Sequence, residues 1–195
     1  MAITNGYITL ANFKAMKNVT STDTADDAVI ERMIEQASRY MDAQTGRTFY
    51  AREDTRYFDV PGGRELRLDD DLLTITTLTN GDGTELADTE YNLVPKNTAP
   101  HYAIKLKQGS SYYWNSDGSG NTEDVISVAG TWGYVDGAPM DVQQAVEDIV
   151  NRMYNRRYGT NNDGQVKVTA AGVVVTPRDV SSQTQRTINY YKRRL

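Results

Sequence analysis

The segment TADDAVIERMIEQASRYMDAQTG, which runs from Thr24 to Gly46, carries the clearest helical pattern in the chain. Its apolar residues recur at steps of three and four, so they share one face of an α-helix: Ile30, Met33, Ile34, Ala37, Tyr40 and Met41. Thr24 is the predicted N-cap, and Gly46 is the predicted left-handed C-cap. The pattern predicts a helix over residues 25–45 whose apolar face needs a partner.

The best partner for this face lies far away in the sequence. Residues 141–158 form a second amphipathic pattern, with a wide apolar stripe of Val142, Ala145, Val146, Ile149, Val150, Met153 and Tyr154. Asp141 is its predicted N-cap, and three arginines crowd its C-terminal end, where the helix dipole favours positive charge. A shorter helix is predicted over residues 10–17. Two long helices and one short N-terminal helix therefore predict a small helical bundle.

The residues between the two long helices change to the alternation of β-strands. Arg56, Phe58 and Val60 alternate with polar neighbours, and NGDG at residues 80–83 is typical of a hairpin turn. About six short strands are expected, with Asp69-Asp70-Asp71 in a solvated turn. The prediction is an α+β fold in which residues 54–135 form an antiparallel β insertion.

The charge of the chain divides near residue 151. Residues 1–151 hold 12 Lys and Arg against 24 Asp and Glu, whereas residues 152–195 hold 9 against 2. We therefore expect a core over residues 1–159 and a C-terminal arm over residues 160–195, with a last short helix after Val180. An acidic body with a basic tail suggests that the tail binds an acidic surface or nucleic acid. A solvated tail that only balances charge is the alternative.

The composition excludes several kinds of chemistry. The chain has no cysteine and one histidine, His101, so disulfides, thiolate sites and multi-histidine metal sites are excluded. Asp69, Asp70 and Asp71 do not converge well on a cation, because neighbouring strand residues point to opposite faces. We expect His101 on the surface, and we predict no catalytic residue, no metal and no cofactor. No transmembrane run or signal segment is visible, so we expect the chain to stay in the cytoplasm where it is made.

Two segments are candidates for binding. Tyr112, Tyr113 and Trp114 lie in a polar loop and are candidate contacts to a neighbouring subunit, because aromatic residues are enriched at interfaces. Stacking on sugars or bases and core filling are the alternatives. The chain ends in aromatic, aliphatic and basic residues of the types found in binding hot spots, which are Ile188, Tyr190, Tyr191, Arg193 and Arg194. The alternative is an intramolecular helix that covers the chain's own core.

A series of short motifs runs in order along nearly the whole chain. It consists of Tyr7–Leu10 with Phe13-Lys14, Asp26–Ile34, Ala37–Met41, Thr45–Phe49, Tyr91–Leu93, Val128–Tyr134, Pro139 with Ala145 and Val146, and Tyr190–Arg194. Together these motifs resemble the head–tail connector, or adaptor, proteins of tailed bacteriophages. None of them is catalytic, and their order and spacing carry the resemblance.

The resemblance implies a structural virion protein and not an enzyme. Connectors of this family form a ring, usually of twelve subunits, beneath the portal protein at the capsid vertex. DNA passes through the ring without sequence-specific binding, and a tail-completion (stopper) protein or the tail attaches below. The implied location is the neck of the virion, reached after assembly in the host cytoplasm, with no membrane partner. We expect residues 178–195 to bind the portal as an arm, with Ile188, Tyr190 and Tyr191 as anchors and Arg193 and Arg194 as charge partners. The resemblance also makes the tail a candidate partner of Tyr112, Tyr113 and Trp114.

Other classes of function stay open at this point. The chain could be a different neck or tail-completion protein. It could also be a β-rich module that binds glycans or the host through Tyr112, Tyr113, Trp114 and Trp132. A hydrolase that uses Asp69 or Asp71 is a further alternative, although no second carboxylate forms a convincing pair with either residue.

Overall fold

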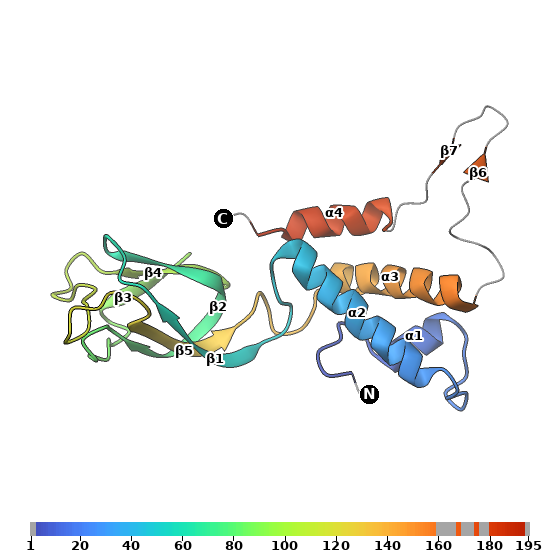
Figure 1. Ribbon diagram of the computed structural model, residues 1–195, viewed down its shortest axis with the longest axis horizontal. Helices are drawn as coiled ribbons and strands as arrows, with labels where there is room; N and C mark the ends of the chain where they lie inside the picture. Colours follow the sequence, from blue (N-terminus) through green and yellow to red (C-terminus); the bar gives the residue numbers. More distant parts are fainter. Residues whose placement is uncertain (1–2, 159–166, 169–173, 176–179, 194–195) are drawn as a thin grey trace. The chain divides into compact units, whose positions relative to one another are not determined.

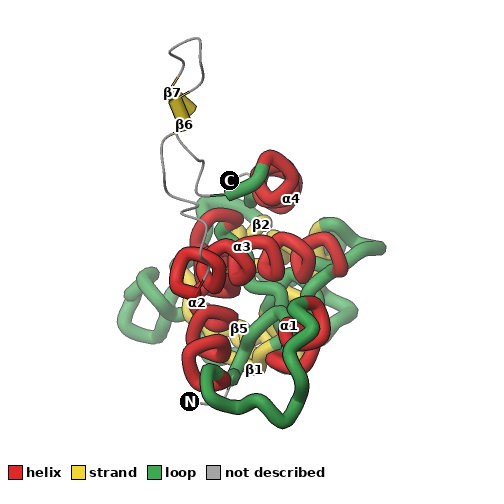
Figure 2. Tube along the Cα trace, turned by 90° about the vertical axis from the view of Figure 1, so that its right-hand side faces the viewer, coloured by secondary structure: helices red, strands yellow, loops and turns green. Residues whose placement is uncertain are grey.

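The computed structural model describes residues 3–158, 167–168, 174–175 and 180–193 (Figure 1). The chain divides into two compact units, one of Met1–Gly46 with Ala138–Leu195 and one of Arg47–Gly137. The first, the helical unit, contains α1 (Leu10–Met16), α2 (Asp27–Thr45), α3 (Met140–Tyr158), α4 (Ser182–Tyr191) and the antiparallel pair β6 (Lys167–Val168) and β7 (Val174–Val175). The second, the sheet unit, contains β1 (Arg52–Phe58), β2 (Glu65–Thr79), β3 (Tyr91–Val94), β4 (His101–Leu106) and β5 (Ile126–Trp132). Figure 2 colours these helices and strands separately.

The helical unit is built on the contact between α2 and α3. The apolar stripes of the two helices are largely buried, with Ile30, Met33, Ile34, Ala37 and Met41 on α2 and Val142, Ala145, Val146, Ile149 and Val150 on α3. The predicted C-cap is confirmed, because Gly46 has φ 66° and its N–H bonds to the carbonyl of Asp42. The predicted N-cap Thr24 is wrong. The helix begins at Asp27, and the carboxylate of the capping Asp26 accepts a hydrogen bond from Tyr158 instead of capping the backbone.

The predicted small bundle of two long helices and a short N-terminal helix, followed by a C-terminal arm, is wrong. The helical unit has a fourth helix, α4, which contacts both α2 and α3. Thr184 and Ile188, four residues apart on one face of α4, are buried in this unit. Residues 182–191 therefore cover the chain's own core, which was the alternative considered for the C-terminal segment.

The sheet unit is one antiparallel sheet with the strand order β1-β5-β2-β4-β3. The long strand β2 changes partner along its length. Its first part pairs with β4, where Glu65 lies opposite Lys105, and its second part pairs with β5, where Thr79 lies opposite Ser127. Irregularities in both registers bend the strand. Strand residues and the loop residues Leu86 and Trp114 form one core, which consists of Phe58, Leu66, Leu68, Leu72, Leu78, Leu86, Ile104, Leu106, Trp114, Ile126, Val128 and Trp132.

The acidic run Asp69-Asp70-Asp71 lies inside β2, so the expected solvated turn is wrong. The strand continues on both sides of this run and is 15 residues long in all, and the sheet has five strands instead of about six. The run of acids is accommodated at the bend of the strand because arginine side chains reach it there.

Candidate interaction surfaces

The described residues bring together no group of three or more His, Asp or Glu side chains that could hold a metal ion. His101 is buried at the start of β4, so its predicted surface position is wrong. Its Nδ1 lies 2.7 Å from the carbonyl oxygen of Pro95 and must donate, because a carbonyl only accepts. His101 therefore has a structural contact. Within the described part of the chain, no helix has the length and apolar character needed to cross a membrane.

The three acids of β2 are paired with arginines of the sheet unit. Asp71 is buried and lies 2.6 Å from a guanidinium nitrogen of Arg47. Arg56 on β1 contacts Asp69 at 2.9 Å and Asp70 at 2.8 Å. Arg52 also contacts Asp70. These carboxylates therefore join β1 to the bend of β2, and they do not form an open site.

Arg56 is the centre of this cluster. Its guanidinium also lies 4.5 Å from the ring centroid of Trp132, which fills the core beneath it. Burial lowers the pKa of Arg56, but the hydrogen bonds and charges of Asp69 and Asp70 outweigh that effect and raise it above the ordinary value. The cation is therefore fixed, and the cluster has the character of a structural ion-pair network.

The structure separates the three adjacent aromatic candidates. Trp114 is 7% exposed and lies in the core of the sheet unit, whereas Tyr113 is 63% exposed and Tyr112 is 37% exposed. Trp132 is also buried, and its Nε1 donates to the carbonyl oxygen of Asp54 at 3.1 Å. The two tryptophan rings that a glycan-binding module would offer for stacking are therefore occupied by the core.

Two residues from neighbouring loops hold Tyr113 in position. Arg64 donates to three carbonyl oxygens of residues 107–112 at 2.6–3.2 Å, and its guanidinium lies 4.9 Å from the centroid of the Tyr113 ring. The buried Asn80 donates to the carbonyl oxygen of Tyr113 at 2.8 Å. Gly81 is needed here, because a Cβ atom would lie 2.1 Å from the carbonyl oxygen of Asn115. The exposed Tyr113 therefore lies on a loop whose backbone is fixed by hydrogen bonds.

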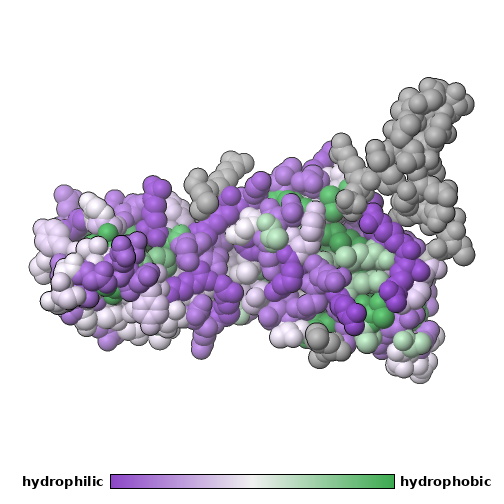
Figure 3. Space-filling view, viewed as in Figure 1, coloured by the Kyte–Doolittle hydropathy of each residue, from purple (hydrophilic) through white to green (hydrophobic). Residues whose placement is uncertain are grey.

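The loops around Tyr113 form an acidic end of the sheet unit, which we call the loop end (residues 59–64, 80–90 and 107–125; Figure 1). It contains eight acidic residues (Asp or Glu) and two basic residues (Lys or Arg). The whole sheet unit contains 15 acidic and eight basic residues. The loop end thus has a net charge of −6 out of −7 for the unit. Figure 3 shows hydrophilic side chains over much of the visible face of this unit. The charge suits a basic partner surface.

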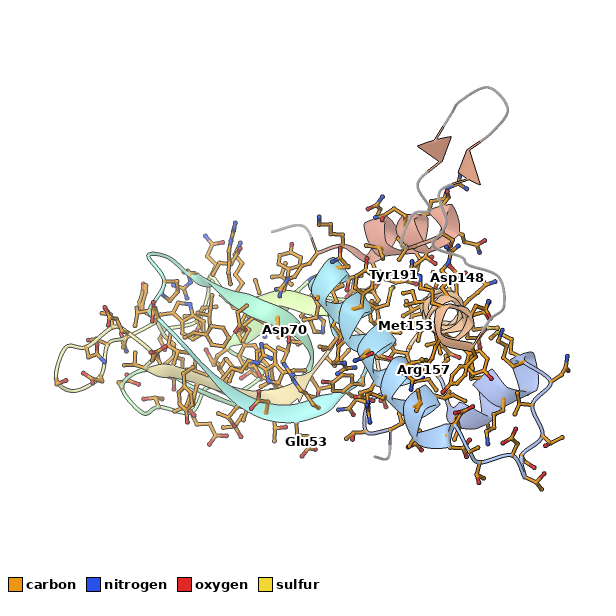
Figure 4. The ribbon with its side chains drawn as sticks, turned by 45° about the vertical axis from the view of Figure 1, so that its right-hand side comes forward. Glu53, Asp70, Asp148, Met153, Arg157 and Tyr191 are labelled. Carbon is orange, nitrogen blue, oxygen red and sulfur yellow. The ribbon has the colours of Figure 1, made fainter. Side chains whose placement is uncertain are left out.

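The C-terminal helix α4 is attached to the helical unit at both ends. At its start, Ser181 caps the helix by accepting from the N–H of Thr184 at 3.1 Å, and the Thr184 hydroxyl donates to Asp148 at 2.9 Å. At its end, the Tyr191 hydroxyl donates to Asp141 at 3.0 Å. Figure 4 shows Tyr191 and Asp148 on the facing sides of α4 and α3.

Asp148 is the electrostatic centre of this attachment. Partial burial raises its pKa. The hydroxyl groups of Ser181 and Thr184 and the guanidinium of Arg152 outweigh that effect, so the pKa of this carboxyl lies below its ordinary value. Asp148 is therefore charged near neutral pH, and its ionised form stabilises the docked α4.

The predicted C-terminal binding residues fall into two sets. Ile188 is 2% exposed and Tyr191 is bonded to Asp141, so both hold α4 in place. Tyr190 is 78% exposed and stacks edge-on against the Tyr191 ring at 4.9 Å. Arg193 is half-buried, and its N–H donates to the carbonyl oxygen of Thr45 at 2.7 Å. Arg194 lies outside the described residues.

The outward side of α4 carries no opposing charge. Residues 180–193 contain Arg186, Lys192 and Arg193 but no Asp or Glu. Arg186 and Lys192 are exposed, as is Tyr190 between them. Of the predicted binding residues on α4, Tyr190 is the one that the docked helix leaves largely exposed, and Arg186 and Lys192 are exposed cations that the sequence analysis did not select.

Comparison with known proteins identifies related families and folds. Residues 7–76 match the model of a family described as phage gp6-like head-tail connector protein. The matched region runs from the N-terminal segment through α1, α2 and β1 into β2. The resemblance to head–tail connectors seen in the sequence is confirmed by this match. No curated protein sequence matches the chain significantly.

Solved structures match over the full length of the chain. One is a chain of the structure described as the neck of an empty GTA particle computed with C6 symmetry, with a TM-score of 0.60 and 17% identity. Another belongs to the virion of a native gene transfer agent (GTA) particle, with a TM-score of 0.58 and 19% identity. Each match covers 100% of this chain and 95% of the other. At these identities, the likeness establishes the fold.

Proposed function

We propose that this chain, whose residues 7–76 match the gp6-like head–tail connectors, is a structural neck protein of a tailed virus-like particle. As a head–tail adaptor it forms a ring beneath the portal, leaves a channel for DNA and joins the capsid to the tail. The observation that carries the proposal is the full-length fold match to a protein in the neck of a GTA particle. A structural role also agrees with ion pairs and core contacts that use the charged residues of the sheet unit internally.

The assembled form is a homo-oligomeric ring in the virion neck, with twelve subunits as the expected number. The GTA neck structure was computed with six-fold symmetry, which a ring of six or twelve copies satisfies. DNA passes through the ring during packaging and is not held by sequence. The negative sheet unit supports passage without tight binding, because affinity for DNA comes mainly from cations that neutralise phosphates.

The C-terminal residues contact the portal. Ile188 and Tyr191 hold α4 on the helical unit, and Tyr190, Arg193 and Arg194 make the contact. The outward side of α4 has positive charge and an exposed aromatic ring, which suits an acidic portal surface with room for the tyrosine. The tyrosines of the loop end, Tyr112 and Tyr113, contact the tail-completion protein, the tail or a neighbouring subunit.

The test uses two substitutions that remove exposed tyrosines from different units. Tyr190→Ala should reduce co-purification with the portal at least about tenfold, and Tyr113→Ala should leave it unchanged. Tyr113→Ala should instead reduce attachment of the tail side or ring formation. Each variant is the matched control for the other, and negative-stain images should show rings with a central hole. Equal portal binding by wild type and Tyr190→Ala would contradict the proposed contact between α4 and the portal.

The same experiment separates an adaptor from another neck or tail-completion protein. An adaptor binds the portal directly in the absence of tail proteins. If the purified chain binds tail proteins and never the portal, it is another neck or tail-completion protein and not the adaptor.

A further inference from the structure

A groove of about 260 Å³ lies between the first half of α3 and the first half of α4, inside the helical unit. Its lining consists of Asp141, Gln144, Ala145, Asp148, Ser181, Gln183, Thr184 and Thr187. This set offers two carboxylates, two amides and three hydroxyls, and contains no lysine or arginine. The described lining therefore suits a side chain that is positively charged and donates several hydrogen bonds.

The two carboxylates of the groove are held by the fold. Asp148 is fixed by Thr184 and Arg152, and Asp141 accepts from the Tyr191 hydroxyl and its neighbouring backbone N–H. A carboxylate oxygen has two lone pairs, so these bonds leave acceptor capacity for a further donor. The groove is thus a preformed acceptor site and needs no rearrangement before a cation enters.

Arg157, at the other end of α3, matches the chemistry of this site. It is exposed, and its described contacts are with Tyr158, whose hydroxyl accepts from Nε at 3.2 Å and whose ring centroid lies 5.5 Å from the guanidinium carbon. Neither contact neutralises the charge. The planar guanidinium, with its fork of donors, fits a groove lined by carboxylate and amide oxygens.

Arg157 and the groove of the same copy face in opposite directions. An α-helix turns about 100° per residue, so Arg157 projects about 180° away from Asp148. The rise of the helix also separates Arg157 from Gln144 by about 20 Å. Figure 4 shows Asp148 on the side of α3 that faces α4 and Arg157 on the other side. Arg157 can therefore enter only the groove of another copy.

We propose that the groove between α3 and α4 binds the Arg157 side chain of a neighbouring copy of this chain. A site and its complement on opposite sides of one helix produce a head-to-tail contact, which repeats around a closed ring. The contact rests on the proposed ring and identifies the residues that join its subunits. It leaves the outward side of α4 available for the portal.

Charge reversal tests the contact. Arg157→Glu removes the guanidinium that enters the groove of the neighbouring copy. Gln144→Lys places a positive charge in the groove at an exposed lining residue. Each variant should weaken self-association at least about tenfold, measured by sedimentation velocity or mass photometry with or without the portal ring. Arg32→Glu, an equal charge change at an exposed residue of α2, is the matched control and should assemble normally. Circular dichroism should show the same helix content in all three.

Complementation makes the test specific. In a mixture of the two single variants, copies with Arg157→Glu present a carboxylate to the positively charged groove of copies with Gln144→Lys. The unchanged Arg157 of the Gln144→Lys copies then enters the unchanged groove of the Arg157→Glu copies. Alternating rings should therefore return in the mixture, and rings should also form from a variant that carries both substitutions. Failure to rescue, or an equal defect in Arg32→Glu, overturns the contact.

Two outcomes separate this inference from the proposed function. If wild type forms rings and Arg157→Glu forms them equally well, the ring stands and the contact is wrong. If wild type forms no ring at any concentration, alone or on the portal, both the ring and the contact are wrong.

Discussion

Arg56 shows how a single residue decides the meaning of an acidic run. Three consecutive aspartates inside a strand would repel one another and destabilise it. Here Arg56 lies within 3 Å of both Asp69 and Asp70, while Arg47 neutralises Asp71. The run is therefore stable at the bend of β2 because cations from elsewhere in the sheet unit reach it.

Replacing Arg56 should destabilise the sheet unit selectively. Arg56→Ala leaves Asp69 and Asp70 without this cation and uncovers Trp132, so we expect a loss of about 2–3 kcal/mol in the free energy of unfolding. Both tryptophans lie in the sheet unit, so urea unfolding followed by tryptophan fluorescence reports on this unit alone. Arg67→Ala is the control, because Arg67 is exposed and lies 3.7 Å from Glu65, and should cost under about 0.5 kcal/mol. Equal losses in both variants would contradict a special role for Arg56.

Several residue positions were outside the reach of sequence reasoning. Trp114 stands beside two exposed tyrosines in a polar loop, and nothing in its neighbours distinguishes a core residue from a surface one. His101 was expected at the surface because it follows a proline in a polar segment, yet the carbonyl of Pro95 gives it a buried partner. In both cases the partner is set by how loops fold back on the sheet.

At the scale of elements, α4 depends on the ionised form of Asp148. The pKa of Asp148 is lowered in the folded protein, so folding favours the carboxylate. Its contribution to stability is fully present above the ordinary value of 3.8 and is lost as the pH falls below that value. The attachment of α4 is therefore stable at neutral pH and sensitive to acid.

We predict that α4 opens in acid before the rest of the helical unit. Protonation of Asp148 weakens its bonds to Thr184 and Arg152, so amide exchange in α4 should accelerate as the pH falls below the ordinary value of 3.8, after correction for the intrinsic rate. Hydrogen exchange read by NMR or mass spectrometry measures this. Asp148→Asn keeps the size of the side chain and removes its charge, so it should flatten the pH dependence. An unchanged pH profile in that variant would assign the effect to another group.

The sequence predicted α2 and α3 better than the docking of α4, because the apolar periodicity of the two long helices extends over more residues. The periodicity of α2 and α3 spans 19 residues in each helix, and Gly46 ends α2 as expected. The 10-residue α4 carries two described buried side chains, too few to reveal from sequence whether it docks on its own core or on a partner. The start of α2 was predicted at residue 25 with Thr24 as its cap, whereas the helix begins at Asp27 and Asp26 occupies the cap position with its carboxylate bonded to Tyr158.

At the scale of the whole molecule, the sheet unit is inserted between two halves of the helical unit. Its entry and exit are joined to each other, since the N–H of Tyr134 donates to the carbonyl of Thr48 at 2.8 Å and the Phe49 and Tyr134 rings meet edge-on. Its core is formed entirely by residues of that unit. An insertion with adjacent ends and its own core imposes few constraints on the fold that receives it.

The sheet unit should therefore fold without the helices. Residues 47–137 expressed alone should unfold cooperatively, with tryptophan fluorescence like that of the full chain. The complementary protein, in which a short Gly-Ser linker replaces these residues, should keep the helix content expected for α1 to α4. Circular dichroism and thermal unfolding of both proteins are the measurements. A non-cooperative transition in residues 47–137 would show that this core needs the helical unit.

The sequence by itself determined the two long helices, the β character of the residues between them and the resemblance to head–tail connectors. The helices and the β character follow from periodicity and local residue choice, which are properties of the sequence itself. The resemblance rests on a series of short motifs in a fixed order. Only the tertiary structure decided that α4 covers the core, that Asp69 to Asp71 are neutralised by arginines, and which aromatic residues are exposed. Those outcomes depend on contacts between residues far apart in sequence, and no local pattern specifies which distant side chain will supply a partner.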